Sequence, residues 1–228
     1  MSKDIFLETI KGNLIVSCQA RKGWPMYGKE ILAAFAVAAK QGGAVCIRAS
    51  GKENINEIKK KVDLPIIGIN KVFTDYPVYI TPTYDSAKEI LDENIEVIAL
   101  DATRRSRPNN EKLEDIVYKI RKNYPDVLIM GEISTYEEAI DVIDLNFDLL
   151  STTLSGFTEN SGKKDSVDLD LIEKLSKNLD IPIIAEGLIH TPQDARKAIE
   201  AGAYSVVVGT AITRPEIITE RFVKEIVK

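Results

Sequence analysis

Short apolar runs rich in β-branched residues recur along the chain, each followed by a longer stretch with helical spacing of apolar positions. Within the runs, apolar residues are almost continuous rather than alternating with polar ones, which is typical of strands covered on both faces. Eight such runs occur: NLIVSCQ (13–19), AVCIRA (44–49), IIGIN (66–70), VIALD (97–101), VLIMGE (127–132), DLLSTT (148–153), PIIAEG (182–187) and SVVVGT (205–210). The pattern therefore predicts eight strands that alternate with helices.

The stretches between the runs carry signals that begin and end helices. Residues 28–40 form a helical pattern that is followed by two glycines. Thr135 precedes Glu138 by three residues, the spacing of a capping box, in which each side chain satisfies a free backbone N–H of the other. Thr191 is followed by Pro192, a cap residue and then a proline suited to the first helical position.

Eight strand–helix units in a chain of 228 residues favour a (β/α)8 barrel, the TIM barrel, as one domain over residues 1–228. No linker-like or low-complexity stretch divides the sequence. An open, doubly wound α/β sheet is the alternative fold. Its usual nucleotide-binding function calls for a G-x-G-x-x-G or Walker pattern, and neither occurs in the sequence.

Composition narrows the class of protein. With 44% hydrophobic and 29% charged residues the chain resembles an ordinary globular protein, and its net charge of -5 does not indicate a nucleic-acid partner. The longest apolar run, residues 31–39, is too short to span a membrane, and the N-terminus lacks a signal-peptide pattern. We therefore expect a cytoplasmic protein in which Cys18 and Cys46 are buried and reduced.

Polar residues close the eight predicted strands. In a (β/α)8 barrel the carboxyl ends of the strands meet on one rim, where the active site lies. Any one of these residues is explained equally well as the solvated start of a loop, but their convergence on one rim predicts a site. The residues are Gln19, Arg48, Lys71, Asp101, Glu132, Thr152, Thr153, Glu186 and Thr210.

Lys71 and Glu186 are the candidate catalytic pair. Burial disfavours the charged form of a lysine, so Lys71 is a candidate base or Schiff-base nucleophile. The alternative is that Lys71 neutralises a carboxylate of the rim. Lys71 ends the third strand and Glu186 the seventh, so the two lie on opposite sides of an eight-stranded ring and can address one small ligand as an acid–base pair.

The loops after the seventh and eighth strands predict a phosphate site. These loops of a barrel frequently bind phosphate, and here they read AEGLIHTP and VVGTAITRP. Gly187 and Gly209 permit a close approach of the backbone to an anion. Thr210 adds an amide and a hydroxyl, and Arg214 a charge-assisted contact. The alternative is that both segments are plain turns.

Three further features lie near the predicted rim. The loop 154–166 is long for this fold, which predicts a lid over the substrate or, alternatively, a disordered surface loop. Trp24, after the first strand, is expected to pack under the first helix more than to wall the pocket. His190 is the single histidine and is expected to have a structural or solvent role, so no metal site is predicted.

Segments along nearly the whole chain resemble one enzyme family. They are IVSCQA, VCIRA, IIGINK, VYITPT, IALDATRRSRP, TTLSGFT, IIAEG and VVVGTAITRP, between Gly12 and about Pro215. They are similar to N-acetylmannosamine-6-phosphate 2-epimerases of sialic acid catabolism. The resemblance implies a TIM barrel that interconverts N-acetylmannosamine 6-phosphate and N-acetylglucosamine 6-phosphate, needs no cofactor and forms a homodimer.

The resemblance also implies roles for individual residues. Lys71 is the expected catalytic lysine and Glu186 its acidic companion. Sugar contacts are expected from Gln19, Arg48, Asp101, Glu132 and Thr153, and phosphate contacts from Gly187, Gly209, Thr210 and Arg214.

Two positions depart from the family pattern. Glu132 stands where the family often has aspartate, and Leu188 stands where it often has a basic residue. Because Leu188 is apolar, one cation that could bind the phosphate is missing. Phosphate binding is then expected to depend more on Arg214 and the backbone amides.

The chemistry that we expect is proton removal at carbon 2 of the open-chain aldehyde. Neutral Lys71 would take the proton, and Arg48 would stabilise the enolate oxygen. Lys71, a substrate group or Glu186 would return the proton. Other possibilities are a pentose-phosphate epimerase, a Schiff-base lyase and a catalytically inactive phosphosugar-binding barrel.

Overall fold

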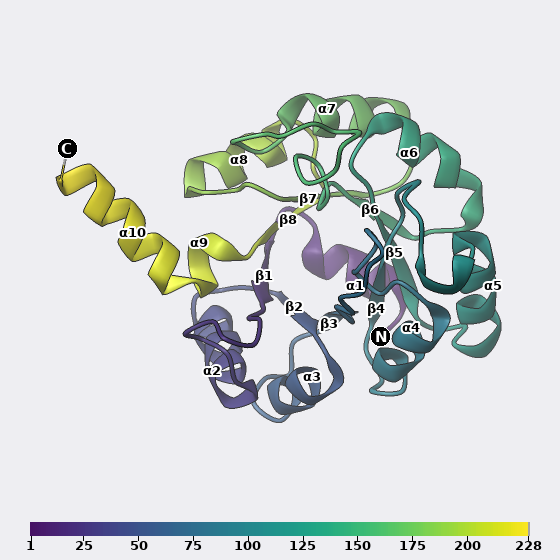
Figure 1. Cartoon of the computed structure of the whole chain (residues 1–228), viewed down its shortest axis with the longest axis horizontal. Coiled ribbons are helices and arrows are strands. Elements are labelled where there is room, and N and C mark those ends of the chain that lie inside the picture. Colours follow the sequence, from purple (N-terminus) through teal and green to yellow (C-terminus); the bar gives the residue numbers. More distant parts are fainter. Residues whose placement is uncertain (228) are drawn as a thin grey trace.

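The computed structural model describes residues 1–227 and shows a closed barrel of eight parallel strands in sequence order (Figure 1). Strand β1 pairs with β2 on one side and with β8 on the other, which closes the ring. The strands are β1 (Leu14–Cys18), β2 (Cys46–Ser50), β3 (Ile66–Ile69), β4 (Val97–Asp101), β5 (Leu128–Glu132), β6 (Leu149–Ser151), β7 (Ile183–Glu186) and β8 (Ser205–Val208). Each overlaps one predicted run, so the predicted (β/α)8 fold is confirmed and the open sheet is wrong.

Helices surround the strands in an outer ring (Figure 1). The ring contains α2 (Lys29–Gln41), α3 (Lys52–Lys59), α4 (Tyr84–Leu91), α5 (Leu113–Asn123), α6 (Tyr136–Val142), α7 (Leu169–Asn178) and α8 (Pro192–Glu200). Outside this pattern are α1 (Lys3–Ile10), α9 (Thr210–Thr213), α10 (Pro215–Ile226) and the 3-10 turns η1 (Pro108–Asn110) and η2 (Ile143–Leu145).

Two of the predicted helix starts can be compared in detail. Thr191 caps α8 in a complete capping box with Asp194, and Pro192 takes the first helical position as expected. Thr135 caps α6 by accepting the Glu138 N–H at 3.2 Å, but the predicted capping box is incomplete. The Glu138 carboxylate instead accepts bonds from the N–H and hydroxyl of buried Ser134, at 2.8 and 2.7 Å.

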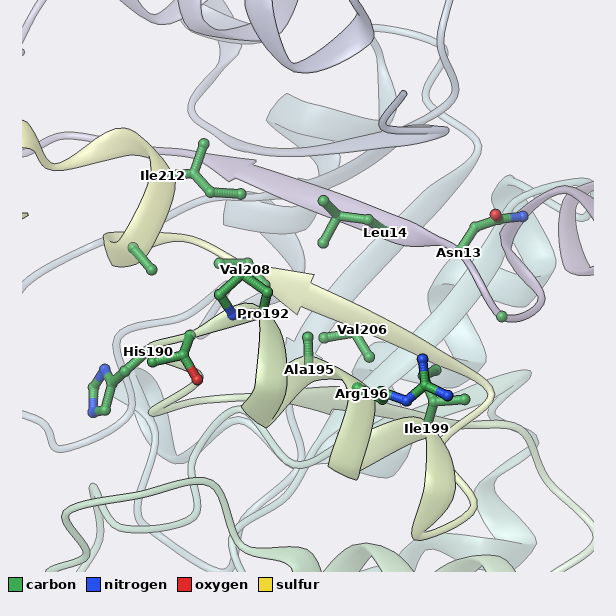
Figure 2. A pocket seen from close by; sticks show the side chains of 13 residues that line it. Asn13, Leu14, His190, Pro192, Ala195, Arg196, Ile199, Val206, Val208 and Ile212 are labelled. Carbon is green, nitrogen blue, oxygen red and sulfur yellow. The ribbon is translucent and has the colours of Figure 1, made fainter. Parts of the chain in front are cut away.

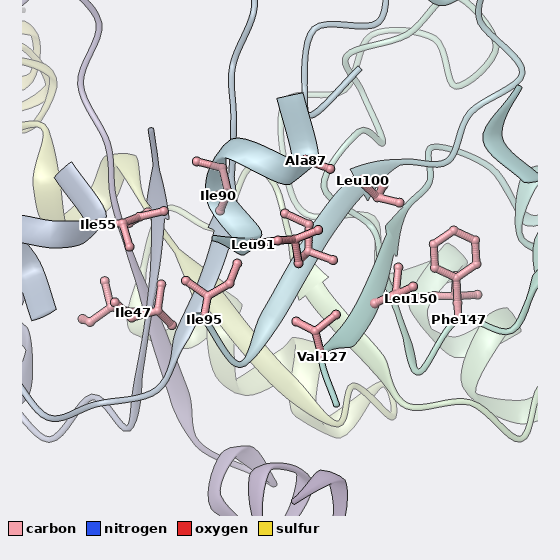
Figure 3. Close-up of a cluster of buried hydrophobic side chains, with 14 of the residues drawn as sticks. Ile47, Ile55, Ala87, Ile90, Leu91, Ile95, Leu100, Val127, Phe147 and Leu150 are labelled. Atoms are coloured by element: carbon pink, nitrogen blue, oxygen red, sulfur yellow. The ribbon is translucent and has the colours of Figure 1, made fainter. Parts of the chain in front are cut away.

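The larger part of the core lies between the strands and the helices (Figure 3). Gly68 in β3 shows how close this packing is. A Cβ atom at this position would lie 2.5 Å from both Ile90 Cγ2 in α4 and Ile95 Cδ1, so any side chain here would push the helix away. The glycine inside the run IIGIN is therefore explained by the approach of α4 to the sheet.

A second apolar cluster fills the inside of the barrel. Phe6 and Ile10 of α1 are fully buried against residues near the amino ends of the strands, including Ile15, Val97 and Leu149. Helix α1, which the sequence pattern did not predict, therefore closes the amino end and leaves the carboxyl end as the open one (Figure 1).

Two expectations from composition concern the core and the membrane. Cys18 and Cys46 are free and buried, as predicted, and burial raises the pKa of the Cys18 thiol to about 12. Within residues 1–227, none of the helices combines the length and apolar character needed to cross a bilayer.

Helix α10 differs from the other helices because it extends away from the barrel (Figure 1). None of its described residues is buried, and its outer half carries large exposed apolar side chains. Phe222 is 67% exposed and Ile226 is 80% exposed. The helix therefore presents apolar surface that the rest of the chain does not cover.

Candidate active site

A cavity of about 500 Å³ opens at the carboxyl ends of the strands. Loops that follow β1, β3, β6, β7 and β8 contribute to its wall. Nine of the predicted site residues line it: Gln19, Arg48, Lys71, Thr153, Glu186, Gly187, Gly209, Thr210 and Arg214. The barrel thus brings together residues that lie up to almost the whole chain apart.

Lys71 lies two residues after the end of β3. Its backbone pairs with Ile80 in an isolated antiparallel bridge, and its N–H donates to Ser50 Oγ at 3.3 Å, so the position of the residue is fixed. Within residues 1–227 its ammonium forms no salt bridge. Burial, reinforced by the positive charge of Arg48, lowers the pKa of Lys71 to about 8.

Arg48 is buried at the centre of the site and binds two carboxylates. Its guanidinium forms a salt bridge with Glu132 and another with Glu186, the second at 3.2 Å between Nη1 and Oε1. Because one guanidinium faces two carboxylates, the ion cluster carries a net negative charge when both acids are ionised. This excess charge favours protonation of one of them.

The surroundings of Glu186 raise the pKa of its carboxyl group. Burial raises the pKa of Glu186 to about 7, Arg48 opposes this rise, and the negative charge of Glu132 adds to it. Thr153 Oγ1 donates to Glu186 Oε2 at 2.9 Å. The carboxyl group therefore exchanges protons near neutral pH, in the same range as the Lys71 amine.

The end of β6 holds Glu186 in place. Thr152 Oγ1 accepts the Glu186 N–H at 3.2 Å and donates to the Glu186 carbonyl at 3.0 Å. The next residue, Gly187, has φ +103°, a conformation that disfavours other residues, and a Cβ there would lie 3.4 Å from the Thr153 carbonyl oxygen. The chain can therefore turn immediately after the carboxylate.

Two of the predicted sugar contacts do not line the cavity. Glu132 is fully buried and binds Arg48, and its Oε2 has no hydrogen-bond partner among the described residues. Asp101 is also fully buried, where its carboxylate binds Thr103 and Arg105. In this structure Glu132 contacts Arg48, and Asp101 contacts residues of the loop after β4.

The predicted phosphate residues gather at the β7 and β8 side of the cavity. Gly209 packs on β1, since a Cβ there would lie 3.4 Å from Ser17 Cβ, and Thr210 begins the short helix α9. The Arg214 guanidinium carbon lies 3.7 Å from the centroid of the Trp24 ring, and its Nε donates to Glu216 at 2.7 Å. Leu188 lines the same side.

Two aromatic residues line the cavity although the sequence patterns did not predict it: Trp24 was expected elsewhere, and Tyr79 was not predicted at all. Trp24 lines the cavity and carries Arg214 on its ring, so the expectation that it packs under the first helix is wrong. Tyr79, which follows the strand β3 by ten residues, also lines the cavity and stacks on Phe73 with ring centroids 5.3 Å apart. The segment VYITPT carried the signal for Tyr79 only through the family resemblance.

His190 connects three parts of the chain. Its Nε2 lies 3.2 Å from the Asp165 carbonyl oxygen and its Nδ1 lies 2.9 Å from Arg221 of α10. Because an arginine only donates, Nδ1 accepts and Nε2 carries the proton. A structural role for His190 agrees with the sequence prediction, and no group of three metal-binding side chains occurs within residues 1–227.

The loop 154–166 is folded against the barrel. Ser155 Oγ donates to Asp168 at 2.6 Å, Thr158 Oγ1 donates to Ser134 Oγ at 2.8 Å, and Ser161 Oγ accepts the Gly156 N–H at 3.0 Å. Leu154 and Phe157 line the cavity. The loop therefore forms part of the cavity wall, as a substrate-covering segment requires, and the alternative of a disordered surface loop does not describe it.

Comparison with other proteins places this barrel in a family. A family model described as "Putative N-acetylmannosamine-6-phosphate epimerase" matches residues 32–228. A protein of Caldanaerobacter subterraneus subsp. tengcongensis named "Putative N-acetylmannosamine-6-phosphate 2-epimerase" is 48% identical over 224 residues, 98% of this chain and 94% of that protein. A Clostridium perfringens (strain SM101) protein of the same name is 52% identical over 217 residues, 95% and 97% of the two chains.

Solved structures agree with these matches. The N-acetylmannosamine-6-phosphate 2-epimerase from Clostridium perfringens superposes with a TM-score of 0.92 at 50% identity, over 96% of this chain and 95% of that one. A thiamine phosphate pyrophosphorylase from Pyrococcus furiosus shares only the fold, with a TM-score of 0.61 at 17% identity over 91% and 89% of the chains. On these matches, the chain belongs to the N-acetylmannosamine-6-phosphate 2-epimerase family.

Proposed function

We propose that this protein interconverts N-acetylmannosamine 6-phosphate and N-acetylglucosamine 6-phosphate by moving a proton at carbon 2. The observation that carries the proposal is the pair formed by Lys71 and Glu186 on one cavity, with pKa values of about 8 and about 7. A proton-transfer catalyst works best when its pKa is close to the working pH. The family to which the chain belongs supplies the substrate.

The proposed reaction begins with the open-chain aldehyde of the sugar, because a carbon-bound proton becomes acidic beside a carbonyl group. The neutral Lys71 amine removes the proton from carbon 2, and the electrons of that C–H bond form the enolate. The protonated carboxyl group of Glu186 gives a proton to the opposite face of carbon 2. Reversal of the two protonation states describes the opposite direction.

Arg48 is the proposed stabiliser of the enolate oxygen. Its guanidinium lines the cavity beside both proton-transfer groups and is held by Glu132 and Glu186. A donor that is fixed before the reaction stabilises developing charge without reorganising. When Glu186 becomes protonated, its salt bridge with Arg48 weakens, and more of the positive charge of Arg48 can act on the substrate.

The substrate phosphate is proposed to bind at the β7 and β8 side. Backbone amides near Gly187, Gly209 and Thr210 provide donors there, and Arg214 provides a guanidinium that the Trp24 ring supports. Gln19, in the loop after β1, and Thr153, in the loop after β6, are the proposed sugar contacts. None of these steps calls for a cofactor.

Incubation with N-acetylmannosamine 6-phosphate in heavy water, followed by NMR, tests the function. The expected result is formation of N-acetylglucosamine 6-phosphate that carries deuterium at carbon 2. Product without deuterium would overturn the proton-transfer scheme, and absence of product would overturn the epimerase function.

A Schiff-base lyase is the second candidate, because a buried lysine amine with a lowered pKa suits that chemistry as well. Borohydride reduction in the presence of the phosphosugar distinguishes the two. A lyase would be trapped as a covalent adduct on Lys71, whereas the epimerase retains its original mass.

We also propose a homodimer in which α10 docks on a second copy. A groove of about 350 Å³ runs over the outer faces of β1 and β8 beside α8, where the barrel pattern calls for a helix (Figure 2). Its floor and wall are apolar and include Leu14, Val206, Ala195 and Ile199. Helix α10 follows β8 in sequence but extends away from this groove and exposes apolar side chains (Figure 1).

A second copy related by a two-fold axis can place its α10 in this groove and receive α10 of the first copy in return. This exchange would cover both the apolar groove and the apolar side chains of α10. Both surfaces are already exposed in the single chain.

A further inference from the structure

Arg21 lies at the mouth of the cavity, in the loop that follows β1. Its side chain is exposed. The guanidinium carbon lies 4.7 Å from the centroid of the Phe73 ring and 5.4 Å from that of the Trp24 ring. The two rings belong to different loops, after β3 and β1. Cation–π contacts are weak at exposed sites, so a stronger partner can draw Arg21 away from them.

Arg21 differs from the other guanidiniums of the cavity in its salt-bridge partners. Arg48 is bound by Glu132 and Glu186, and Arg214 is bound by Glu216. Arg21 has no carboxylate partner within the part of the chain that the structure describes. It is therefore the arginine of this cavity whose positive charge is not already matched by a neighbouring acid.

Arg21 also lies at the end of the cavity where the phosphate is proposed to bind. Trp24 has the guanidiniums of both Arg21 and Arg214 near its ring. The residue that follows Gly187 on that side is Leu188, which is apolar, so the loop after β7 offers amides but no cation at that position. A phosphate dianion bound there would lie close to Arg214, which is paired with Glu216, and to Arg21, which has no carboxylate partner among the described residues.

We propose that Arg21 is a substrate-binding residue that grips the phosphate of the sugar. On binding, its guanidinium leaves the Phe73 ring and donates two N–H bonds to phosphate oxygens, opposite the amides of Gly209 and Thr210. The planar fork of arginine suits this geometry. Arg21 thereby selects phosphorylated over unphosphorylated N-acetylmannosamine. The inference rests on the proposed epimerase function.

Steady-state kinetics of four proteins tests the inference: wild type, Arg21→Gln, Arg21→Lys and the neighbouring Lys22→Gln. Lys22 is exposed and does not line the cavity, so it controls for loss of one positive charge from the loop. The Arg21→Gln variant is expected to raise the KM for N-acetylmannosamine 6-phosphate and the inhibition constant of inorganic phosphate, each by about tenfold or more. Its kcat changes less than about twofold, because the contact serves binding.

The other variants sharpen the result. Arg21→Lys is expected to recover part of the affinity, since charge remains but the fork is lost. Lys22→Gln leaves both constants within about twofold of wild type, as expected for one exposed charge. On unphosphorylated N-acetylmannosamine, wild type and Arg21→Gln are expected to have equal kcat/KM. Melting temperatures confirm folding, because Arg21 lies in an exposed loop.

Two outcomes overturn the inference. If Arg21→Gln and Lys22→Gln have the same KM and the same inhibition by phosphate, Arg21 does not bind the phosphate. If Arg21→Gln lowers kcat alone, Arg21 acts through its charge on Lys71 instead. A wild-type protein that forms no product overturns the epimerase function, and calorimetric titration with inorganic phosphate then tests Arg21 by itself.

Discussion

The two ends of the barrel are made from the same eight strands but differ in chemistry. At the amino end, the fully buried side chains of Phe6 and Ile10 of α1 fill the opening with apolar groups. At the carboxyl end, Lys71, Arg48 and Glu186 gather around a cavity, with burial shifting the pKa values of both Lys71 and Glu186 toward neutrality. The residues that fill the closed end and the candidate catalytic residues therefore lie at opposite ends of the strands.

This separation gives the strongest prediction at the open end. Lys71→Ala removes the proposed base and is expected to lower kcat/KM by roughly 10²–10⁴-fold, the usual contribution of a general base. Because Lys71 forms no salt bridge within residues 1–227, the free energy of unfolding should change little. Activity assays together with denaturant unfolding provide the measurement. Near-normal turnover would remove Lys71 from the mechanism.

The matching change at the closed end is Phe6→Ala. The side chain is fully buried in the interior cluster, so its loss is expected to lower the free energy of unfolding by about 3–5 kcal/mol. Well below the melting temperature, kcat/KM should stay within about twofold of wild type. A selective loss of activity in a stable Phe6→Ala protein would show that the two ends are coupled.

Helix α10 belongs to neither end, and Phe222→Asp tests its proposed role. A charge on the exposed apolar face is expected to weaken the dimer at least about tenfold, since a carboxylate would be buried without a partner. Analytical ultracentrifugation over a range of concentrations measures this. Thr219→Asp, at another exposed position of the helix, is the control. A wild-type protein that stays monomeric would contradict the helix exchange.

The smallest expected effect concerns pH. With a neutral Lys71 and a protonated Glu186 required, kcat/KM should rise as Lys71 loses its proton, fall as Glu186 loses its proton, and be greatest between about pH 7 and 8. The Thr153 hydroxyl lowers the pKa of Glu186, so Thr153→Val should raise that pKa and move the falling limb to higher pH. The rising limb should stay in place. A falling limb that does not move would exclude Glu186 from that limb.

Sequence patterns predicted the strands well because each strand is buried on both faces and therefore continuously apolar. They also placed Lys71 and Glu186 on one rim, since the order of strands in a barrel follows the order in the chain. Helix α1 was missed because its two fully buried residues, Phe6 and Ile10, lie in a short and mostly exposed segment. The role of α1 in closing the amino end becomes evident only in the folded barrel.

The remaining differences come from loops, whose paths strand order does not determine. Asp101 ends β4 as predicted, but the chain after it folds back so that Thr103 and Arg105 enclose its carboxylate. Trp24 comes after β1 at the predicted rim. Its ring lies in the cavity wall next to Arg214, which is far away in the sequence. Such placements depend on partners distant in sequence, which local patterns do not reveal.

The central claim is that Lys71 and Glu186 serve opposite faces of carbon 2, and hydrogen exchange in a Glu186→Gln variant tests it most directly. Each epimer is incubated with the variant in heavy water, and exchange at carbon 2 is compared with epimer formation by NMR. The account predicts that one epimer exchanges its hydrogen through Lys71 while formation of the other epimer is strongly reduced. An unchanged ratio of epimer formation to exchange would contradict it and would show that Lys71 serves both faces.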